Sequence, residues 1–395
     1  MKILAINSGS SSLKFSLFNM DDDSIVTSGL FERIGIDGSN YTIKYNGEEI
    51  KEELITDSHV EAVKILLDKL ITLNIISSYD EIGCVGHRIL HGKDVFDKSI
   101  IIDDDVLNKL EELIDLGPLH MKANVGGVRA FMEVLPNTPM VAVFDTAFHQ
   151  TMDKVSYMYP VPYDWYEKYG IRKYGFHGIS HKYVCEEAKK ILNKEHFKLI
   201  SCHLGSGASI CAIEDGKCVD TSMGFTPLAG VMMGTRSGDV DPSIIPYVME
   251  KDGKNALEII NELNKDSGLL GLSEYSSDMR DILAKCDEED ERAILAKNKF
   301  VRRVVDYIGS YYLLLGGVDM IVFTAGVGEN SVPVRREICE KLSTIGVKIN
   351  LDENQKRSEF VKLSTDESSV LVYVIPTNEE LVIARDSYEL VRNGI

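Results

Sequence analysis

No stretch of this sequence is apolar for as long as a membrane-spanning helix requires. Such a helix needs about 20 consecutive apolar residues, and the best candidate, residues 311–323, is interrupted by Asp319 and two glycines. The first residues also lack the apolar segment of a secretory signal peptide. We therefore expect a soluble, cytoplasmic protein with no membrane partner.

Basic residues are scarce relative to acidic ones. Lys and Arg number 43 against 62 Asp and Glu, which gives a net charge of −19. Nucleic acids and anionic membranes select for basic surfaces, so neither is an expected partner. A few arginines and lysines gathered in a cleft could still bind a small anion.

The cysteines show no pattern typical of disulfides or of a zinc site. There are seven, an odd number, and none forms a C-x-x-C pair. This scatter argues against a disulfide framework and against a zinc site, and favours a reducing compartment.

The chain is long enough for two domains, at 395 residues of which 44% are hydrophobic. Apolar runs typical of strands alternate with helical patterns, which predicts an α/β fold. The predicted strands are Ile3–Ile6, Ile82–Val85, Met140–Phe144, Leu199–Cys202, Met320–Phe323 and Val370–Ile375. The predicted helices are Val60–Leu73, Asp104–Leu116, His181–Asn193, Ala256–Asn264, Asn298–Leu315 and Glu380–Ile395, the last capped by Asn378.

The first loop, Asn7–Ser12, consists of small polar residues between two apolar segments. Residues 13–18 alternate with a period of two, which predicts the return strand of a β-hairpin rather than a P-loop. Lys14 would reach back toward the tip. A plain turn and a phosphate site both remain open. Residues 198–209 repeat the pattern 196 positions later, which indicates either a duplicated domain or two unrelated turns.

Four further segments place charged or imidazole side chains in turns. Arg88 lies between two histidines after a strand, where it could clamp a carboxylate or form a surface ion pair. Asp145 ends a strand, where it could hold a metal or cap a helix. His177 is flanked closely by glycines and precedes a predicted helix for which Ser180 is a potential cap. Arg236 lies in a long Gly-rich loop. With the glycine turn 326–330, these segments indicate an enzyme that handles phosphate.

In combination these motifs resemble the acetate kinase family from Asn7 to Glu379. They are NSGSSSLKF, GHRILHG, VFDTAFH, YGFHGISH, HLGSGAS, GTRSGDVDP, FTAGVGEN and PTNEE. The resemblance implies an actin-like/sugar-kinase fold of two duplicated α/β domains with ATP in the cleft between them, and a homodimer. The expected N-terminal lobe is 1–147 plus 380–395, and the expected C-terminal lobe, which would bind nucleotide and dimerise, is 148–379.

The resemblance also implies a role for each matching residue. Asn7 and Glu379 would hold Mg²⁺, or Mn²⁺, with Asp145 near the metal. Catalysis would involve Asp145, Arg88, Arg236 and His177. Acetate would be bound by Arg88, Leu90, Leu119, His120, Phe176 and Pro227. ATP or ADP would be bound by Ser10, Ser12, Lys14, His203, Leu204, Gly205, Ser206, Gly207, Asp278, Met279, Arg280, Gly326, Val327, Gly328, Glu329 and Asn330.

The implied activity is reversible phosphoryl transfer from ATP to acetate. A carboxylate needs no strong base to attack a γ-phosphate, which favours direct in-line transfer over a phospho-Asp145 intermediate. Propionate is the alternative acid, although the bulk of Leu90 favours acetate by roughly 1–3 kcal/mol per methylene. A nucleotide-driven actin-like or chaperone-like protein is the alternative from another class. The sequence departs from the family pattern at Lys93, Met121, Lys122, Ile179 and Ser206.

Overall fold

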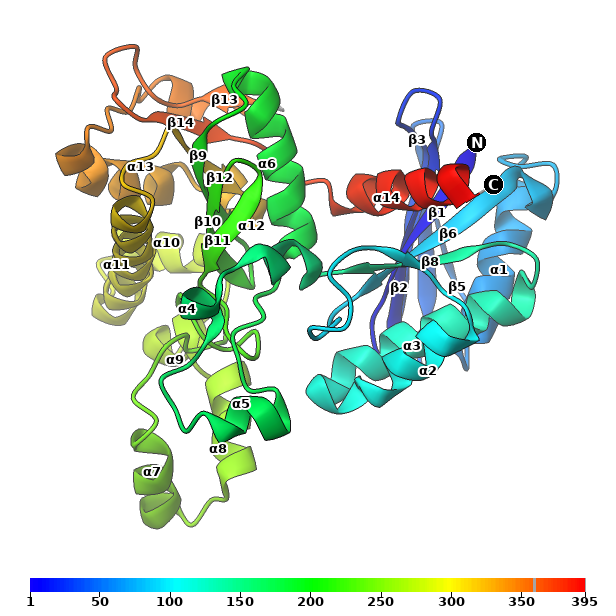
Figure 1. Cartoon of the computed structure of the whole chain (residues 1–395), viewed down its shortest axis with the longest axis horizontal. Coiled ribbons are helices and arrows are strands. Elements are labelled where there is room, and N and C mark those ends of the chain that lie inside the picture. Colours follow the sequence, from blue (N-terminus) through cyan, green and yellow to red (C-terminus); the bar gives the residue numbers. More distant parts are fainter. Residues whose placement is uncertain (358–359, 395) are drawn as a thin grey trace. The chain divides into compact units, whose positions relative to one another are not determined.

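The computed structural model describes residues 1–357 and 360–394, apart from the side chains of Pro118 and Leu119. The chain forms two compact units (Figure 1), which we call unit 1 and unit 2. Unit 1 contains Met1–Phe148 and the segment from Asn378 to the C-terminus, and unit 2 contains His149–Thr377. Each unit has its own sheet.

The sheet of unit 1 has the strand order β5-β4-β3-β2-β1-β6-β8-β7. Its strands are β1 (Lys2–Ser8), β2 (Ser12–Asn19), β3 (Ser24–Glu32), β4 (Asn40–Tyr45), β5 (Glu48–Glu53), β6 (Ile82–Ile89), β7 (Ile100–Ile101) and β8 (Met140–Phe144). Its helices are α1 (His59–Thr72), α2 (Asp104–Glu112), α3 (Pro118–Val134) and α14 (Glu379–Gly394), with 3₁₀ turns η1 (Tyr79–Glu81) and η2 (Ile114–Leu116). A third such turn, η3 (Ala147–Thr151), passes from unit 1 into unit 2.

The sheet of unit 2 has the strand order β11-β10-β9-β12-β14-β13. Its strands are β9 (Lys198–Leu204), β10 (Ala208–Glu214), β11 (Lys217–Thr221), β12 (Met320–Thr324), β13 (Val361–Lys362) and β14 (Leu371–Val374). Its helices are α4 (Lys154–Tyr157), α5 (Asp164–Tyr169), α6 (Gly178–Leu192), α7 (Ile244–Asp252), α8 (Ala256–Lys265), α9 (Gly268–Ser273), α10 (Met279–Asp287), α11 (Glu291–Leu314), α12 (Ala325–Asn330) and α13 (Val332–Lys341), with η4 (Leu342–Ile345) and η5 (Glu353–Gln355). Every predicted strand and helix corresponds to an element of the structure, with ends that differ by up to four residues except in α11, which begins seven residues before the predicted Asn298. The predicted end of the last helix, Ile395, lies outside the described residues.

Six strands of the two sheets share one topology: the order β3-β2-β1-β6-β8-β7 of unit 1 corresponds to the order β11-β10-β9-β12-β14-β13 of unit 2, and unit 1 adds β4 and β5. This likeness is what a duplicated domain would produce. In unit 1, β1 pairs antiparallel with β2 and parallel with β6. In unit 2, β9 pairs antiparallel with β10 and parallel with β12. Both hairpin tips are closed by a glycine amide, which donates to the Ser12 carbonyl from Gly9 and to the Gly207 carbonyl from Gly205. The predicted hairpin at Asn7–Ser12 is therefore confirmed, and it has a counterpart in unit 2.

Helix α3 was not predicted, because two adjacent glycines interrupt its pattern. One of them has a packing reason. A Cβ added at Gly127 would lie 2.2 Å from the Ser8 Oγ, so only a glycine lets this helix approach β1 so closely. The cost in helix propensity is offset by contact with the sheet.

Unit 1 resumes at Asn378, two residues before the predicted boundary at Glu380, and helix α14 explains this difference. The Asn378 side chain accepts a hydrogen bond from the Leu381 amide at 3.1 Å, which confirms Asn378 as a cap. The helix packs on β1 and β6, so Asn378 and Glu379 belong to unit 1, whereas the sequence placed both in the second lobe.

Burial of His87 should make unit 1 sensitive to acid. His87 on β6 is 2% exposed, its ring edge meets Phe131, and burial lowers its pKa to about 3. The unfolded imidazole protonates near pH 6.5, so stability is fully present above that pH and is lost below it, by up to about 1.4 kcal/mol per pH unit. We expect His87→Phe to flatten the dependence of urea unfolding on pH between 6.5 and 4. His196→Gln, a change at a fully exposed ring, is the control; equal slopes in His87→Phe and the unmodified protein would contradict this prediction.

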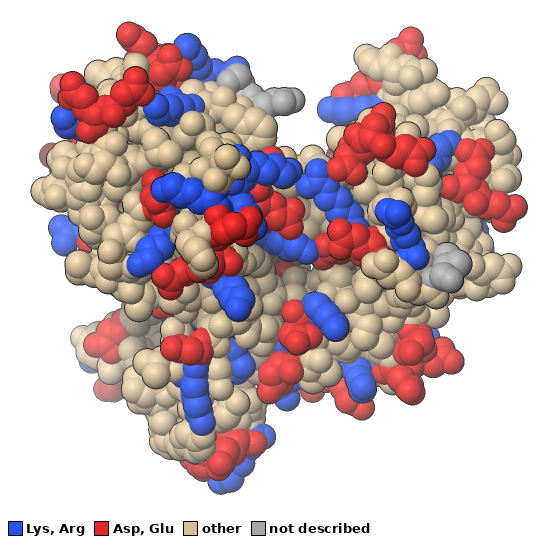
Figure 2. All heavy atoms as spheres, turned by 45° about the horizontal axis from the view of Figure 1, so that its top comes forward, with Lys and Arg blue, Asp and Glu red and all other residues tan. Residues whose placement is uncertain are grey.

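Among the described residues, no helix combines the length and the apolarity needed to cross a bilayer. On the face drawn in Figure 2, basic side chains are interspersed with acidic ones.

Candidate active site

Arg88 and Asp145 are brought together by neighbouring parallel strands of unit 1. Arg88 lies near the carboxyl end of β6, and Asp145 directly follows β8. The guanidinium donates to both carboxylate oxygens, from Nε at 3.0 Å and from Nη2 at 2.6 Å. Asp145 is 1% exposed, so its charge depends on this bidentate pair for compensation.

Glu379, the first residue of α14, joins this pair. Its carboxylate lies 3.9 Å from the Arg88 Nε. Burial raises the pKa of Glu379, and although Arg88 opposes that shift, Asp145 adds to it. Two carboxylates therefore share one arginine, which leaves unit 1 with an excess of negative charge at this point.

The β1–β2 hairpin supplies a third oxygen donor, the Asn7 side chain, near Glu379. Lys14 forms an ion pair with Glu380, the neighbour of Glu379. Asn7 is the direct cross-strand partner of Lys14, and side chains at opposed positions of an antiparallel pair project from the same face. Asn7 therefore faces the start of α14.

These residues fit a divalent cation. The buried Asp145 carboxylate, the half-buried Glu379 carboxylate and an amide oxygen are the hard donors that small divalent cations prefer, and one arginine leaves part of their charge uncompensated. Asn7, Asp145 and Glu379 are thus the residues of unit 1 that could hold the metal.

In unit 2 the predicted histidines lie in one network, in which His203 is buried and His177 is half-buried. His177 has a left-handed backbone, with φ of 59°, and begins α6. Its ring stacks on His203 at 4.1 Å, and its Nδ1 lies 2.9 Å from the Ser209 Oγ. Ser180 is not the helix cap that the sequence predicted: it lies inside α6, and its Oγ is 2.8 Å from the His203 Nδ1.

Arg236 is the cation of this network. Its Nη1 donates to the Pro227 carbonyl at 3.4 Å, and among the described residues it has no carboxylate within ion-pair distance. Burial lowers the pKa of its guanidinium, which nonetheless stays charged at neutral pH. A partly buried arginine without a counterion is suited to bind an anion.

Gly207 lies close to the side chains of both Arg236 and His177. A Cβ at this position would lie 3.3 Å from the Arg236 Nη1 and 3.4 Å from the His177 ring. The hairpin tip therefore passes close to both side chains, and a larger residue would displace them.

We expect Gly207→Ala to lower kcat about tenfold, because the new methyl would shift the Arg236 and His177 side chains, both candidate catalytic groups, by a few tenths of an ångström. Steady-state kinetics would measure the change. Gly309→Ala, on α11 where an added Cβ meets nothing within 4 Å, is the matched control and should keep full activity. Wild-type kcat in Gly207→Ala would contradict the prediction.

A cavity of about 800 Å³ lies within unit 2, at the other end of the same hairpin tip. Many predicted nucleotide residues line it, namely Gly205, Ser206, Asp278, Met279, Arg280, Gly326, Val327 and Asn330. Asp278 accepts from the Arg280 amide at the start of α10 and pairs with its guanidinium. The cavity is large enough for a nucleotide.

Other predicted residues lie elsewhere. His203, Leu204, Gly207, Gly328 and Glu329 are not in the lining. The Glu329 carboxylate instead accepts from the Ala325 amide at 2.8 Å and the Thr377 amide at 3.2 Å, which fixes the start of α12. Ser10, Ser12 and Lys14 belong to unit 1.

Sequence reasoning missed part of the lining, which also includes Leu269, Ser277, Leu283, Ser331, Val332, Pro333 and Arg357. Ser331, Val332 and Pro333 directly follow the glycine turn at 326–330, and Ser277 directly precedes Asp278. The predicted motifs therefore ended a few residues short of the full lining. Leu269 and Arg357 carry no local signal.

The predicted acetate residues are divided between the units. Leu90 and His120 belong to unit 1, and Phe176 and Pro227 to unit 2. The Leu90 amide is fixed by the Asn124 side chain at 2.9 Å. Phe176 is 2% exposed, and Pro227 is half-buried. The side chain of Leu119 lies outside the described residues.

Comparison with known proteins identifies the family. The model of the Acetokinase family matches residues 2–385. The chain belongs to the acetokinase family. It is 55% identical, over 98% of both chains, to the acetate kinases of Bacillus cytotoxicus and Bacillus anthracis.

Solved structures agree with this family. The crystal structure of Porphyromonas gingivalis acetate kinase is 42% identical with a TM-score of 0.94, covering 99% of both chains. A propionate kinase from Francisella tularensis is 41% identical with a TM-score of 0.93, covering 98% of this chain and 99% of that one. The fold is therefore the actin-like α/β fold of acetate kinases, as the sequence predicted. Family membership further implies ATP or ADP and a divalent metal.

Proposed function

We propose that this protein is a Mg²⁺-dependent acetate kinase, which reversibly transfers the γ-phosphoryl group of ATP to acetate and forms acetyl phosphate and ADP. The observation that carries the proposal is the 55% identity to curated acetate kinases over 98% of both chains. The charged residues of both units supply what this reaction needs.

Each charged residue has a part in the transfer. Arg236 and the His177 imidazole bind the phosphoryl group and stabilise its charge as it is transferred. Arg88 orients the acid, whose carboxylate attacks without a general base. Asn7, Asp145 and Glu379 hold Mg²⁺, which neutralises phosphate charge when bound. The cavity at Asp278 and Gly326 takes the nucleotide.

The pairing of Asp145 favours direct in-line transfer. Both of its oxygens accept hydrogen bonds from Arg88, and the side chain is 1% exposed. A phospho-Asp145 intermediate would require one oxygen to leave the guanidinium and become a nucleophile. We therefore assign Asp145 to the metal and to Arg88 rather than to covalent catalysis.

The test is an assay that traps acyl phosphate with hydroxylamine, in the presence of ATP and Mg²⁺, over formate, acetate, propionate and butyrate. We expect acetate to give the highest kcat/KM, because the Leu90 side chain limits the acyl chain. A higher value for propionate would make the protein a propionate kinase. Phosphate release without any acyl phosphate would overturn the enzyme assignment in favour of a nucleotide-driven, actin-like protein.

We further propose a homodimer formed through unit 2. Large apolar side chains are exposed on this unit, including Leu257, Leu313 and Tyr247. Sedimentation equilibrium would detect the dimer, and a monomer at micromolar concentration would contradict it.

A further inference from the structure

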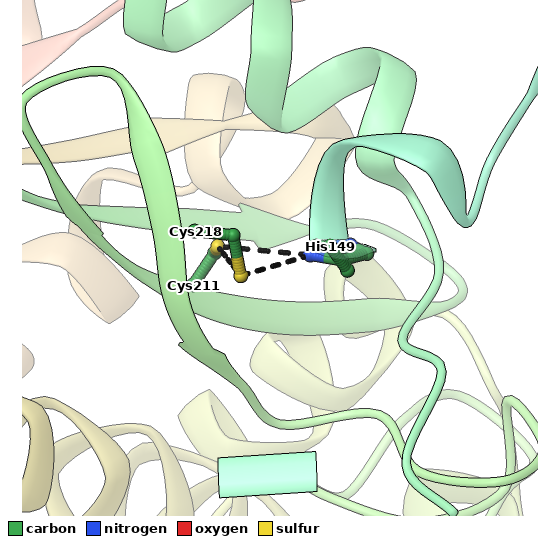
Figure 3. Close-up of side chains that lie close together, drawn as sticks. All are labelled: His149, Cys211 and Cys218. Carbon is green, nitrogen blue, oxygen red and sulfur yellow. Dashed lines mark hydrogen bonds between the residues drawn. The ribbon is translucent and has the colours of Figure 1, made fainter. Parts of the chain in front are cut away.

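A buried cluster of one imidazole and two thiols lies in unit 2, outside the proposed active site (Figure 3). His149 comes from η3, Cys211 from β10 and Cys218 from β11. All three are at most 1% exposed. Cys218 and His149 lie 69 residues apart in the sequence, so spacing gave no sign of the cluster.

The three donor atoms lie at distances that suit one metal ion. The His149 Nδ1 is 3.2 Å from the Cys218 Sγ and 4.0 Å from the Cys211 Sγ, and the two sulfurs are 3.5 Å apart. Around tetrahedral zinc, bond lengths of 2.3 Å to sulfur and 2.0–2.1 Å to nitrogen give edges of about 3.8 Å between sulfurs and about 3.6 Å between sulfur and nitrogen. The triangle requires shifts of only a few tenths of an ångström.

The histidine is held in the form that a metal ligand needs. Its Nε2 lies 2.9 Å from the Phe176 carbonyl oxygen. A carbonyl can only accept, so Nε2 carries the proton and Nδ1 presents its lone pair to the sulfurs. Donation from the second nitrogen to a backbone carbonyl is the usual support of a metal-bound histidine.

Charge balance selects the ion. Two thiolates and a neutral imidazole carry a charge of −2, so a divalent ion gives a neutral complex, which a buried site tolerates best. Cu⁺ would leave a net negative charge, and Mg²⁺ prefers oxygen donors. Zn²⁺ is the divalent ion that combines thiolate and imidazole ligands most readily.

A further buried polar group lies near the cluster. The Tyr311 hydroxyl has no hydrogen-bond partner among the described residues, and the side chain interacts electrostatically with both thiols. A water at the fourth zinc position would give this hydroxyl a partner.

We propose that His149, Cys211 and Cys218 form a structural zinc site. Binding replaces the two thiol protons, which go to solvent, with two Zn–S bonds and one Zn–N bond. The ion joins the β10–β11 hairpin to η3. Through the Nε2 hydrogen bond it also fixes the Phe176 carbonyl, and with it the turn that carries His177. The proposal departs from the expectation based on sequence spacing, which argued against a zinc site.

The test loads the reduced full-length protein with Zn²⁺ under a non-thiol reductant, removes loose metal by desalting, and measures zinc by elemental analysis. We expect about one zinc ion per chain, and at least about tenfold less in Cys211→Ser and Cys218→Ser. Cys339→Ser, a change at another buried free cysteine of unit 2, is the matched control and should keep its zinc. Circular dichroism checks that each variant is folded.

A second measurement does not depend on the variants. Co²⁺ added to the reduced wild-type protein should produce thiolate-to-cobalt charge-transfer absorption, which Zn²⁺ removes. Less than about 0.1 zinc per chain in the wild type would overturn the site, as would equal loss in Cys339→Ser. A Cys211–Cys218 disulfide in a protein that binds no zinc when reduced would likewise replace this proposal. None of these readouts depends on kinase activity.

Discussion

Replacing Arg236 by alanine should lower kcat by about 10³-fold or more and leave the KM for ATP within about threefold. Among the described residues the guanidinium has no carboxylate partner, and it lies beside His177 across Gly207. In the proposed mechanism its charge is therefore available to the transferring phosphoryl group, whose negative charge spreads over the equatorial oxygens. Arg236 is not part of the lining of the proposed nucleotide cavity at Asp278, so the substitution should leave nucleotide affinity nearly unchanged.

Steady-state kinetics with ATP and acetate would separate kcat from KM. Arg302→Ala, on α11 of the same unit with a side chain 71% exposed, is the matched control and should retain wild-type kinetics. Added guanidinium should restore part of the activity of Arg236→Ala, because it can occupy the vacated position. An unchanged kcat would remove Arg236 from the transfer step.

Replacing Arg88 by alanine should affect both stability and activity. Asp145 is 1% exposed, and Glu379 is also within ion-pair distance of this arginine. Removing the cation leaves buried negative charge uncompensated, which typically costs about 3–5 kcal/mol. Activity should fall by about 10³-fold or more, since in the proposed mechanism Arg88 also orients the acid.

Hydrogen exchange of the β6 and β8 amides in urea would measure the loss within unit 1. Arg129→Ala removes an exposed ion pair with Glu111 and should cost no more than about 1 kcal/mol. The double variant Arg88→Met with Asp145→Leu removes both charges, so it should regain much of the stability while remaining inactive. Recovery of activity in the double variant would contradict the proposed role of Arg88.

Local patterns in the sequence predicted the central strands and the longest helices other than α3, because such patterns report local backbone preferences; the short helices and the edge strands were largely missed. Alternation after Ser12 identified the hairpin, and Asn378 identified the start of the last helix. The pattern failed at α3, where a tertiary requirement for close approach to Ser8 places glycine inside a helix.

For the candidate site, the sequence predicted the residue types but not the contacts between them. The residue types at Arg88, Asp145, His177 and Arg236 pointed to anion chemistry, and the family resemblance supplied their roles. The sequence did not predict which of these side chains would form ion pairs with one another. Arg88 and Asp145 are 57 positions apart, and it is the parallel register of β6 and β8 that joins them.

The sequence by itself determined the α/β class, the duplicated hairpins, the family and most of the charged residues of the site. Only the tertiary structure decided that Glu379 lies beside Arg88 in unit 1, that Arg236 lacks a counterion among the described residues, and that His149 meets two cysteines. The reason is physical. Periodicity and turn chemistry act over a few residues, whereas these contacts depend on strand order and helix packing across long separations in the chain.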